Sequence, residues 1–250
     1  MTHICCLATY PRIINDPRLS FGFRLKLIID LIGNKAQFVA MHFSHSMHHI
    51  PRPFSADHGY EVRQFFAVDG EEIQNFVAAV AGSSPYLKGL IEKEHQWLRG
   101  AFAQPDAALE VELSNLKVTA ALDLMSALRR AKRRVALWTA LCDLAGVWAL
   151  EEVTAALSKF ADLACQMSLN HALKVQLQRG KIPTRKPETD PADLDMFVLA
   201  MGKLGANELN YSSDIDLICF FDESYFASVD VFEARAGFIR ATKNMVALLN

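Results

Sequence analysis

Two carboxylates near the end of the chain, Asp214 and Asp216, stand one residue apart at the start of a short apolar segment. Because side chains alternate between the faces of a strand, a strand over residues 215–221 points both carboxylates the same way and turns Ile215 and Leu217 toward a core. Two carboxylates that share a site repel each other, and a bound cation removes that repulsion. Oxygen ligands suit Mg²⁺, which binds through one or two carboxylates together with substrate phosphates. The pair therefore predicts Asp214 and Asp216 as catalytic magnesium ligands.

A glycine-containing turn precedes the two carboxylates. Gly202 and Gly205 stand where a strand would turn into a short helix, and glycine lets backbone N–H groups approach a phosphate with no Cβ in the way. Lys203 adds a positive charge to this turn, and Ser212 and Ser213 add hydroxyl donors beside the metal. A turn that holds phosphates, followed by carboxylates that hold Mg²⁺, predicts phosphoryl or nucleotidyl transfer.

The glycine turn and the carboxylate pair together are a more specific signal than either of them alone. An Asp-x-Asp pair alone is common on solvated strand ends, whereas here it follows Gly202 by twelve residues. Neither G-x-x-x-x-G-K-[ST] nor G-x-G-x-x-G occurs in the chain, so the sequence predicts neither a Walker loop nor a dinucleotide-binding fold. We therefore favour a phosphate-handling site over an ordinary turn and edge strand.

Apolar segments near the end of the chain must position this site. Residues 196–201 form a continuous apolar run, which is typical of a buried strand, and residues 215–221 predict a second strand. Residues 229–249 predict a helix. The side chains of this helix that are expected to pack are Phe232, Ala236, Ile239, Met245 and Leu249. These elements are typical of the opening of an α/β domain.

A helical region precedes these segments. Apolar residues recur at three- and four-residue steps between residues 69 and 178. One helix is expected to end at Gly82. Ser84 can cap the next helix and Pro85 can begin it, and Gly100 is expected to end it.

The later helices are expected to be longer. One helix is predicted over residues 109–144, and a break over 146–150 separates it from a last helix. That helix begins near Glu151 and Glu152, whose carboxylates suit the positive end of the helix dipole. Residues 180–191 contain three prolines and predict a linker.

Two groups of basic residues invite a binding-site interpretation. The run 129–134 lies on an expected helix, so it predicts a solvated basic face rather than a phosphate or nucleic-acid site. His42, His45, His48 and His49 could share a helical face, but no Asp, Glu or Cys accompanies them to complete a metal site. A solvated segment is the favoured interpretation there.

The composition excludes several classes of protein. The 250 residues are 51% hydrophobic, 22% charged and 10% aromatic, which excludes wholesale disorder. A net charge of −2 disfavours nucleic acid and anionic membranes as partners. Five cysteines without C-x-x-C spacing favour a reducing cytoplasm. Residues 135–150, which most resemble a membrane span, are too short and contain Asp143.

Residues 202–218 closely resemble the signature of the glutamine synthetase adenylyltransferase/adenylyl-removing enzyme family, whose catalytic domains are DNA-polymerase-beta-like nucleotidyltransferases. Residues 83–87 and 128–154 are similar to the helical region before the first catalytic motif of that family. The resemblance covers residues 51–250 and leaves the first fifty unmatched.

Family members carry two such catalytic domains, and this motif after a helical lead resembles the N-terminal, adenylyl-removing one. The resemblance implies Mg²⁺-dependent phosphorolysis, in which inorganic phosphate attacks the adenylyl-tyrosine bond of modified glutamine synthetase and releases ADP. The second domain, which attaches AMP from ATP, would be absent. Glutamine synthetase and the PII signal protein are the implied protein partners, and nucleotide and phosphate the small ligands.

The resemblance also assigns roles to residues. Asp214 and Asp216 would bind Mg²⁺, and the phosphate cradle would consist of Gly202, Lys203, Gly205 and Ser213. The family often has a second glycine where Ala206 stands.

A third carboxylate, which the superfamily brings from a later strand, would lie beyond Asn250. Asp222 and Asp230 are poor substitutes, because one follows the second strand directly and the other begins a helix.

We therefore expect an α+β, mostly α, fold: a helical N-terminal region followed by the start of a polymerase-beta-like nucleotidyltransferase α/β domain. The expected organisation is a poorly defined segment over 1–50, a helical domain over 51–180, a linker over 181–192 and a truncated nucleotidyltransferase domain over 193–250. Two alternatives stay open. One is a catalytically silent remnant that binds glutamine synthetase or PII, and the other is a Mg²⁺-dependent nucleotidyltransferase with a different substrate.

Overall fold

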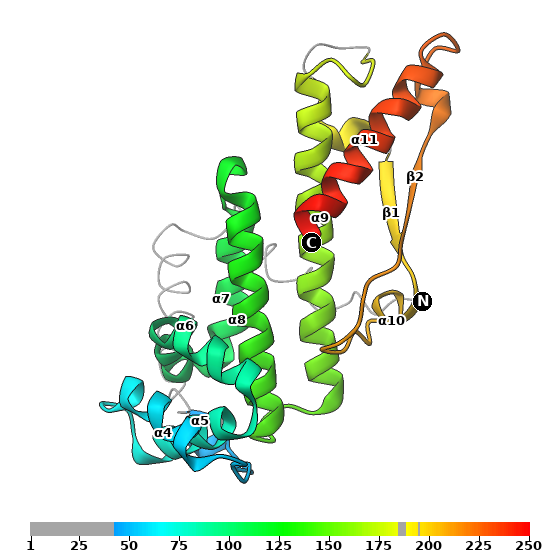
Figure 1. Ribbon diagram of the computed structural model, residues 1–250. Helices are drawn as coiled ribbons and strands as arrows, with labels where there is room; N and C mark the ends of the chain where they lie inside the picture. Colours follow the sequence, from blue (N-terminus) through cyan, green and yellow to red (C-terminus); the bar gives the residue numbers. More distant parts are fainter. Residues whose placement is uncertain (1–42, 185–188, 195) are drawn as a thin grey trace, which may run out of the picture. The chain divides into compact units, whose positions relative to one another are not determined.

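The computed structural model describes residues 43–184, 189–194 and 196–250, which are coloured in Figure 1. The predictions for the first 42 residues, including His42, lie outside this part. Helices dominate the described residues, and two strands pair in an antiparallel sheet. The expected α+β, mostly α, fold is confirmed.

The helical lead consists of α3 (Phe43–Ser46), α4 (Ala56–Arg63), α5 (Glu71–Ser83), α6 (Pro85–Ala103), α7 (Pro105–Lys117), α8 (Leu124–Leu144) and α9 (Leu150–Gln178). The chain then forms β1 (Met196–Ala200), α10 (Gly202–Gly205), β2 (Leu217–Phe221) and α11 (Val231–Leu249). Short 3-10 turns occupy Gln64–Phe66, Ala121–Asp123, Pro191–Leu194 and Glu223–Tyr225. None of the helices in this part is both long and apolar enough to cross a bilayer.

The start of α6 follows the sequence prediction, but its end does not. The Ser84 hydroxyl accepts a hydrogen bond from the Leu87 N–H at 3.3 Å, and Pro85 occupies the first turn. The expected stop at Gly100 is wrong, because α6 continues to Ala103. A glycine costs an exposed helix only about 1 kcal/mol, and the extra turn buries Phe102 in the core.

The single helix expected over residues 109–144 is two helices, α7 and α8. The chain reverses between them, and the Thr119 hydroxyl donates to the Asn115 carbonyl at 3.1 Å where α7 ends. The reversal lets Leu113 and Leu116 of α7 share a core with the first turns of α8. Two packed helices that bury their apolar faces against each other are therefore more stable than the one continuous helix that the pattern predicts.

The basic run is only partly solvated. Arg133 and Arg134 both pair with Glu94 of α6 at 2.8 Å, and Arg134 also pairs with Glu112 of α7 at 3.0 Å. Both carboxylates are buried, at 5% and 4% exposure. The prediction of a solvated face is therefore wrong for these two arginines, because buried carboxylates need cationic partners.

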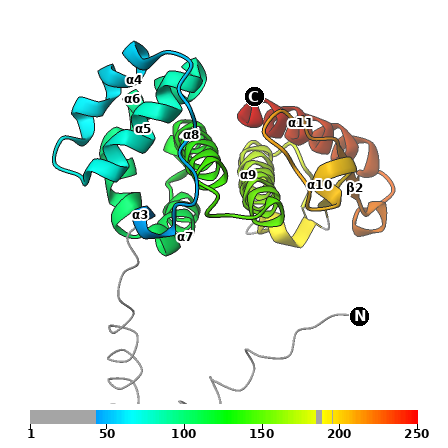
Figure 2. The same cartoon turned by 90° about the horizontal axis from the view of Figure 1, so that it is seen from below.

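Helix α9, the last helix of the helical lead, contacts both the preceding helices and the C-terminal elements. It packs against α8 on one side and α11 on the other, as Figure 2 shows. The face that α11 buries differs in part from the predicted one. Met245 is buried and Leu249 packs against the core as expected, but Phe232 and Ile239 are exposed. The other buried residues of this helix are Ala234, Gly237, Phe238 and Ala241. Small residues on this face allow close approach, because a Cβ at Gly237 would lie 2.3 Å from the Lys181 carbonyl oxygen.

The two strands lie beside this helix pair. In the antiparallel register Val198 is opposite Cys219, and Ala200 is opposite Leu217. One sheet face packs on α9 and α11, and the other exposes Phe197 and Phe220, whose rings stack at 5.3 Å. The expectation of a fully buried strand over 196–201 is therefore wrong within the described residues, because helices cover only one face of it.

Candidate active site

The predicted phosphate turn is the single-turn helix α10, which directly follows β1. Gly202 has a φ of +57°, a left-handed conformation that glycine adopts without strain. The Gly205 N–H donates to the Met201 carbonyl at 3.2 Å, and the Ala206 N–H donates to Gly202 at 3.1 Å. Lys203 is exposed on this turn.

Gly205 has a packing role that involves no ligand. A Cβ at this position would lie 2.4 Å from the Ala200 carbonyl oxygen, far inside van der Waals contact. Glycine therefore lets α10 fold back closely onto the end of β1. A role for Gly205 in holding phosphate stays a prediction.

The two carboxylates lie just before β2, which begins at Leu217 rather than at the expected Ile215. The predicted alternation is nevertheless present, because Asp214 and Asp216 are exposed while Ile215 and Leu217 are half-buried and contact the core. Both carboxylates thus stand on the open side of the segment, where a metal and a phosphate can approach them.

A backbone hydrogen bond brings the carboxylates to the glycine turn. The Met201 N–H, at the residue before Gly202, donates to the Asp216 carbonyl at 2.9 Å. This bond continues the β1–β2 ladder by one step, so the antiparallel pairing places the start of α10 beside Asp216. The structure therefore brings together the two halves of the predicted site.

The two predicted serines differ in their surroundings. Ser212 is exposed. The Ser213 hydroxyl exchanges hydrogen bonds with Asn210, accepting from its N–H at 3.4 Å and donating to its side-chain oxygen. The Ser213 N–H also donates to the Asn210 carbonyl at 3.2 Å. Ser213 therefore closes a tight turn just before Asp214.

Helix α9 anchors the loop between α10 and β2. The Leu209 N–H donates to the Ser158 hydroxyl oxygen at 3.1 Å, and both residues are buried. The side chains of Leu204 and Leu209 enter the same core as α7, α8 and α9. The helical lead thus holds the loop that carries the predicted serines.

A second anchor comes from the end of α8. The Tyr211 hydroxyl donates to the Asp143 carboxylate at 3.1 Å. Partial burial of this half-exposed side chain, followed by the neighbouring negative charge of Asp143, raises the pKa of the Tyr211 phenol. Sequence reasoning missed both anchors, because their partners are 51 and 68 residues apart in the chain.

The electrostatics of the carboxylate pair suit a hard cation. Neither Asp214 nor Asp216 makes an ion pair or a side-chain hydrogen bond with the residues that the structure describes. Two exposed oxygen donors of like charge beside a backbone turn fit Mg²⁺, which keeps waters and shares substrate phosphates. Across the same residues, no three or more His, Cys, Asp and Glu side chains gather into a metal-holding group.

The two later aspartates occupy other places. Asp222 follows β2 at the end opposite to Asp216, where its carboxylate accepts from the Ser224 N–H at 2.8 Å and hydroxyl at 2.9 Å. These hydrogen bonds lower the pKa of Asp222. Asp230 precedes α11 and makes no side-chain cap there.

Comparison with known proteins identifies the relatives of this chain. The family model of glutamate-ammonia ligase adenylyltransferase matches residues 74–250. Three relatives are each named bifunctional glutamine synthetase adenylyltransferase/adenylyl-removing enzyme. The relative from Bradyrhizobium sp. (strain ORS 278) is 40% identical over 182 residues, which are 70% of this chain and 18% of the relative. The relative from Rhodopseudomonas palustris (strain TIE-1) is 38% identical over 184 residues, 71% of this chain and 19% of the relative. The relative from Agrobacterium fabrum (strain C58 / ATCC 33970) is 32% identical over 187 residues, with the same two shares.

The chain thus spans less than a fifth of the length of these curated relatives. The matched stretch contains α6 to α11, including the glycine turn, the carboxylate pair and both anchors of the loop. Because the family model covers well over half of its residues, this chain belongs to the glutamate-ammonia ligase adenylyltransferase family.

Proposed function

We propose that this chain is the adenylyl-removing portion of a glutamine synthetase adenylyltransferase. Its substrate would be glutamine synthetase that carries AMP on a tyrosine, and its reaction would be a Mg²⁺-dependent phosphorolysis that regulates nitrogen assimilation. The observation that carries this proposal is the exposed pair Asp214 and Asp216 within the family-matched stretch. The Asp216 carbonyl accepts a hydrogen bond from Met201, the residue before the glycine turn.

The reaction is a displacement at phosphorus. An oxygen of inorganic phosphate attacks the adenylyl phosphorus and forms the new P–O bond of ADP, while the bond to the tyrosine oxygen breaks. That oxygen leaves with its electron pair and takes up a proton from solvent, which restores the tyrosine. Mg²⁺, when bound by Asp214 and Asp216, would offset negative charge on the phosphoryl oxygens.

The residues of the chain position the reactants. Lys203 would add a positive charge beside the incoming phosphate, and the backbone of α10 would offer N–H groups to it. The anchors at Ser158 and Asp143 would hold the loop before Asp214 in one conformation. A preorganised site of this kind lowers the cost of gathering charge in the transition state.

An adenylyl-removing role also implies protein partners and a cellular location. The protein partners would be glutamine synthetase as substrate and the PII signal protein as regulator, and the reaction would take place in the cytoplasm. The adenylyl-adding activity that the relatives' names include would belong to other parts of a full-length protein.

The test measures ADP released from adenylylated glutamine synthetase by the 250-residue chain in the presence of phosphate and Mg²⁺. Asp214→Asn and Asp216→Asn should each lower the rate by at least about 100-fold, because each removes a charged metal ligand. Asp230→Asn is the matched control, since this aspartate makes no side-chain cap, and it should leave the rate unchanged. Activity retained in either of the first two variants would refute the metal assignment. A chain that binds adenylylated glutamine synthetase without releasing ADP would favour the silent-remnant alternative.

A further inference from the structure

A cavity whose lining residues do not include the carboxylate pair has the composition of an anion site. It has a volume of about 740 Å³ and lies between the α7–α8 turn, the C-terminal half of α9 and the segment before β1. None of the residues of the predicted active site lines it. Its volume falls within the range of about 300–1,000 Å³ that small-molecule sites occupy.

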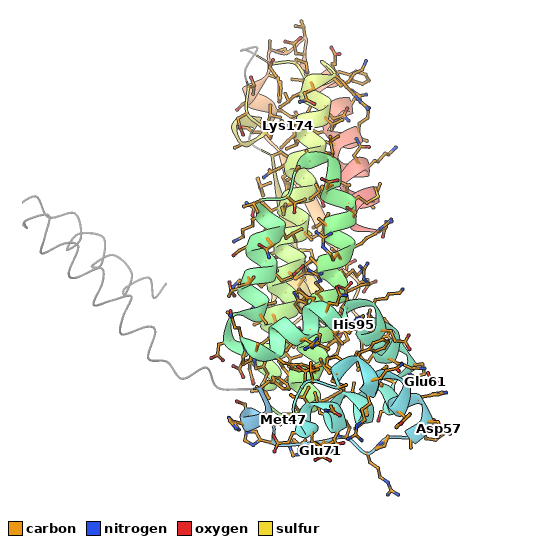
Figure 3. The ribbon with its side chains drawn as sticks, turned by 90° about the vertical axis from the view of Figure 1, so that its left-hand side faces the viewer. Met47, Asp57, Glu61, Glu71, His95 and Lys174 are labelled. Atoms are coloured by element: carbon orange, nitrogen blue, oxygen red, sulfur yellow. The ribbon has the colours of Figure 1, made fainter. Side chains whose placement is uncertain are left out.

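Three basic side chains line this cavity. Lys117 comes from the end of α7, and His171 and Lys174 stand one turn apart on α9. Figure 3 labels Lys174, in the upper part of the ribbon. None of the three makes an ion pair or hydrogen bond to a carboxylate within residues 43–184, 189–194 and 196–250. In contrast, Lys88 and Lys159 each pair with a glutamate.

The acidic side chain of the cavity is already engaged. The Asp190 carboxylate accepts a hydrogen bond from the Ala192 N–H at 2.9 Å, where it caps the short turn before β1. Asp190 keeps its negative charge, so two lysines against one carboxylate leave the described walls net positive, although the whole chain has a net charge of −2. Such a local concentration of positive charge in a hollow attracts multivalent anions.

The other walls supply neutral donors and an apolar surface. The hydroxyl of Thr184 and the amides of Asn170 and Gln178 line the cavity. Met167, Leu124 and Leu177 provide apolar surface on the same walls. A phosphate group combines two negative charges with three acceptor oxygens, so it can use ammonium, imidazole and hydroxyl donors together.

We infer that this cavity binds a small phosphate-bearing molecule at Lys117, His171 and Lys174. The site is separate from the phosphate site of the proposed function, and the inference does not depend on that function. The apolar walls would receive the non-phosphate part of the ligand.

The test uses inorganic pyrophosphate as the probe and the 250-residue chain labelled with ¹⁵N. A buffer with EDTA removes divalent metals, so pyrophosphate has no magnesium to share at the carboxylate pair. Saturable shifts of the amide signals around Lys117 and Lys174 are expected. Lys117→Gln and Lys174→Gln should each raise the dissociation constant about fivefold, and the double variant should raise it by more than about tenfold.

The controls separate charge, location and chemistry. Lys132→Gln removes an exposed lysine of α8 that does not line the cavity, and it should bind as the unaltered chain does. Lys174→Arg keeps the positive charge and should retain most of the affinity for pyrophosphate. Citrate, a carboxylate anion of similar charge, should bind at least about tenfold more weakly. The absence of saturable shifts, or undiminished binding by the double variant, would overturn the site, and equal binding of citrate would overturn the preference for phosphate.

Discussion

The hydrogen bond between Ser158 and the Leu209 N–H offers the sharpest test of how the helical lead supports the candidate site. Replacing Ser158 by Ala removes one oxygen and leaves the side-chain volume nearly unchanged. Ser158 is 0% exposed and Leu209 is 8% exposed, so water cannot replace the lost acceptor without opening the loop. A buried N–H left without a partner costs about 1–3 kcal/mol.

This cost should be measurable both in the exchange of the Leu209 amide and in the stability of the whole chain. The Leu209 amide should exchange with deuterium about 5- to 150-fold faster in Ser158→Ala, which is the same 1–3 kcal/mol expressed as an opening equilibrium. Urea unfolding followed by circular dichroism should show a loss of stability within that range. The proposed phosphorolysis should weaken as well, because the loop leads directly to Asp214.

Ser168 provides a matched control on the same helix. It is also 0% exposed, but its hydroxyl has no hydrogen-bond partner among the described residues. Ser168→Ala should therefore cost no hydrogen bond, and removing an unsatisfied polar atom should leave stability equal or higher. Unchanged Leu209 exchange in Ser158→Ala, or equal destabilisation by both variants, would refute the anchoring role of Ser158.

Three further predictions concern the Tyr211 phenol, the buried Glu94 carboxylate and the close contact at Gly205. Because the pKa of Tyr211 is raised above its ordinary value of 10.0, its contribution to stability is complete below that pH and is lost as the pH rises above it. Between about pH 9 and 11, the melting temperature of the native chain should therefore fall more steeply with pH than that of Tyr211→Phe. Glu94→Gln should lower the free energy of unfolding by about 2–4 kcal/mol, because it removes a buried charge that two arginines share, and urea denaturation would measure it; a loss near zero would contradict a buried network. Gly205→Ala should destabilise by about 1–3 kcal/mol through the clash with the end of β1, whereas Gly100→Ala, with open space around it, should stabilise by up to about 1 kcal/mol; the reverse order of melting temperatures would contradict this assignment.

Local features of the candidate site could be predicted because they depend on neighbouring residues. The alternation that exposes Asp214 and Asp216 and turns Ile215 inward depends on the two-residue period of extended backbone. The cap at Ser84 depends on a side chain three residues from the N–H that it accepts from. Such interactions need no distant partner, so the residue types and their spacing suffice.

Other parts of the fold could not be predicted because their cause lies elsewhere in the chain. Helix α6 passes through Gly100 because Phe102 has a core to enter. Arg133 and Arg134 are not fully solvated, because they form ion pairs with buried glutamates of two other helices. At Gly100, tertiary burial outweighed a local preference of about 1 kcal/mol, and at the arginines the buried carboxylates required cationic partners.

The amino-acid sequence by itself determined which groups this protein can offer: a glycine turn, a lysine and two carboxylates, all within the stretch that the family model matches. Only the tertiary structure decided how those groups are held. Ser158 and Leu209 are 51 residues apart, and Asp143 and Tyr211 are 68 apart, so no local pattern joins them. They meet because α8, α9 and the loop bury apolar side chains in one core. The buried Leu209 N–H needs an acceptor inside that packing, whereas Asp143 and Tyr211 meet at its exposed edge.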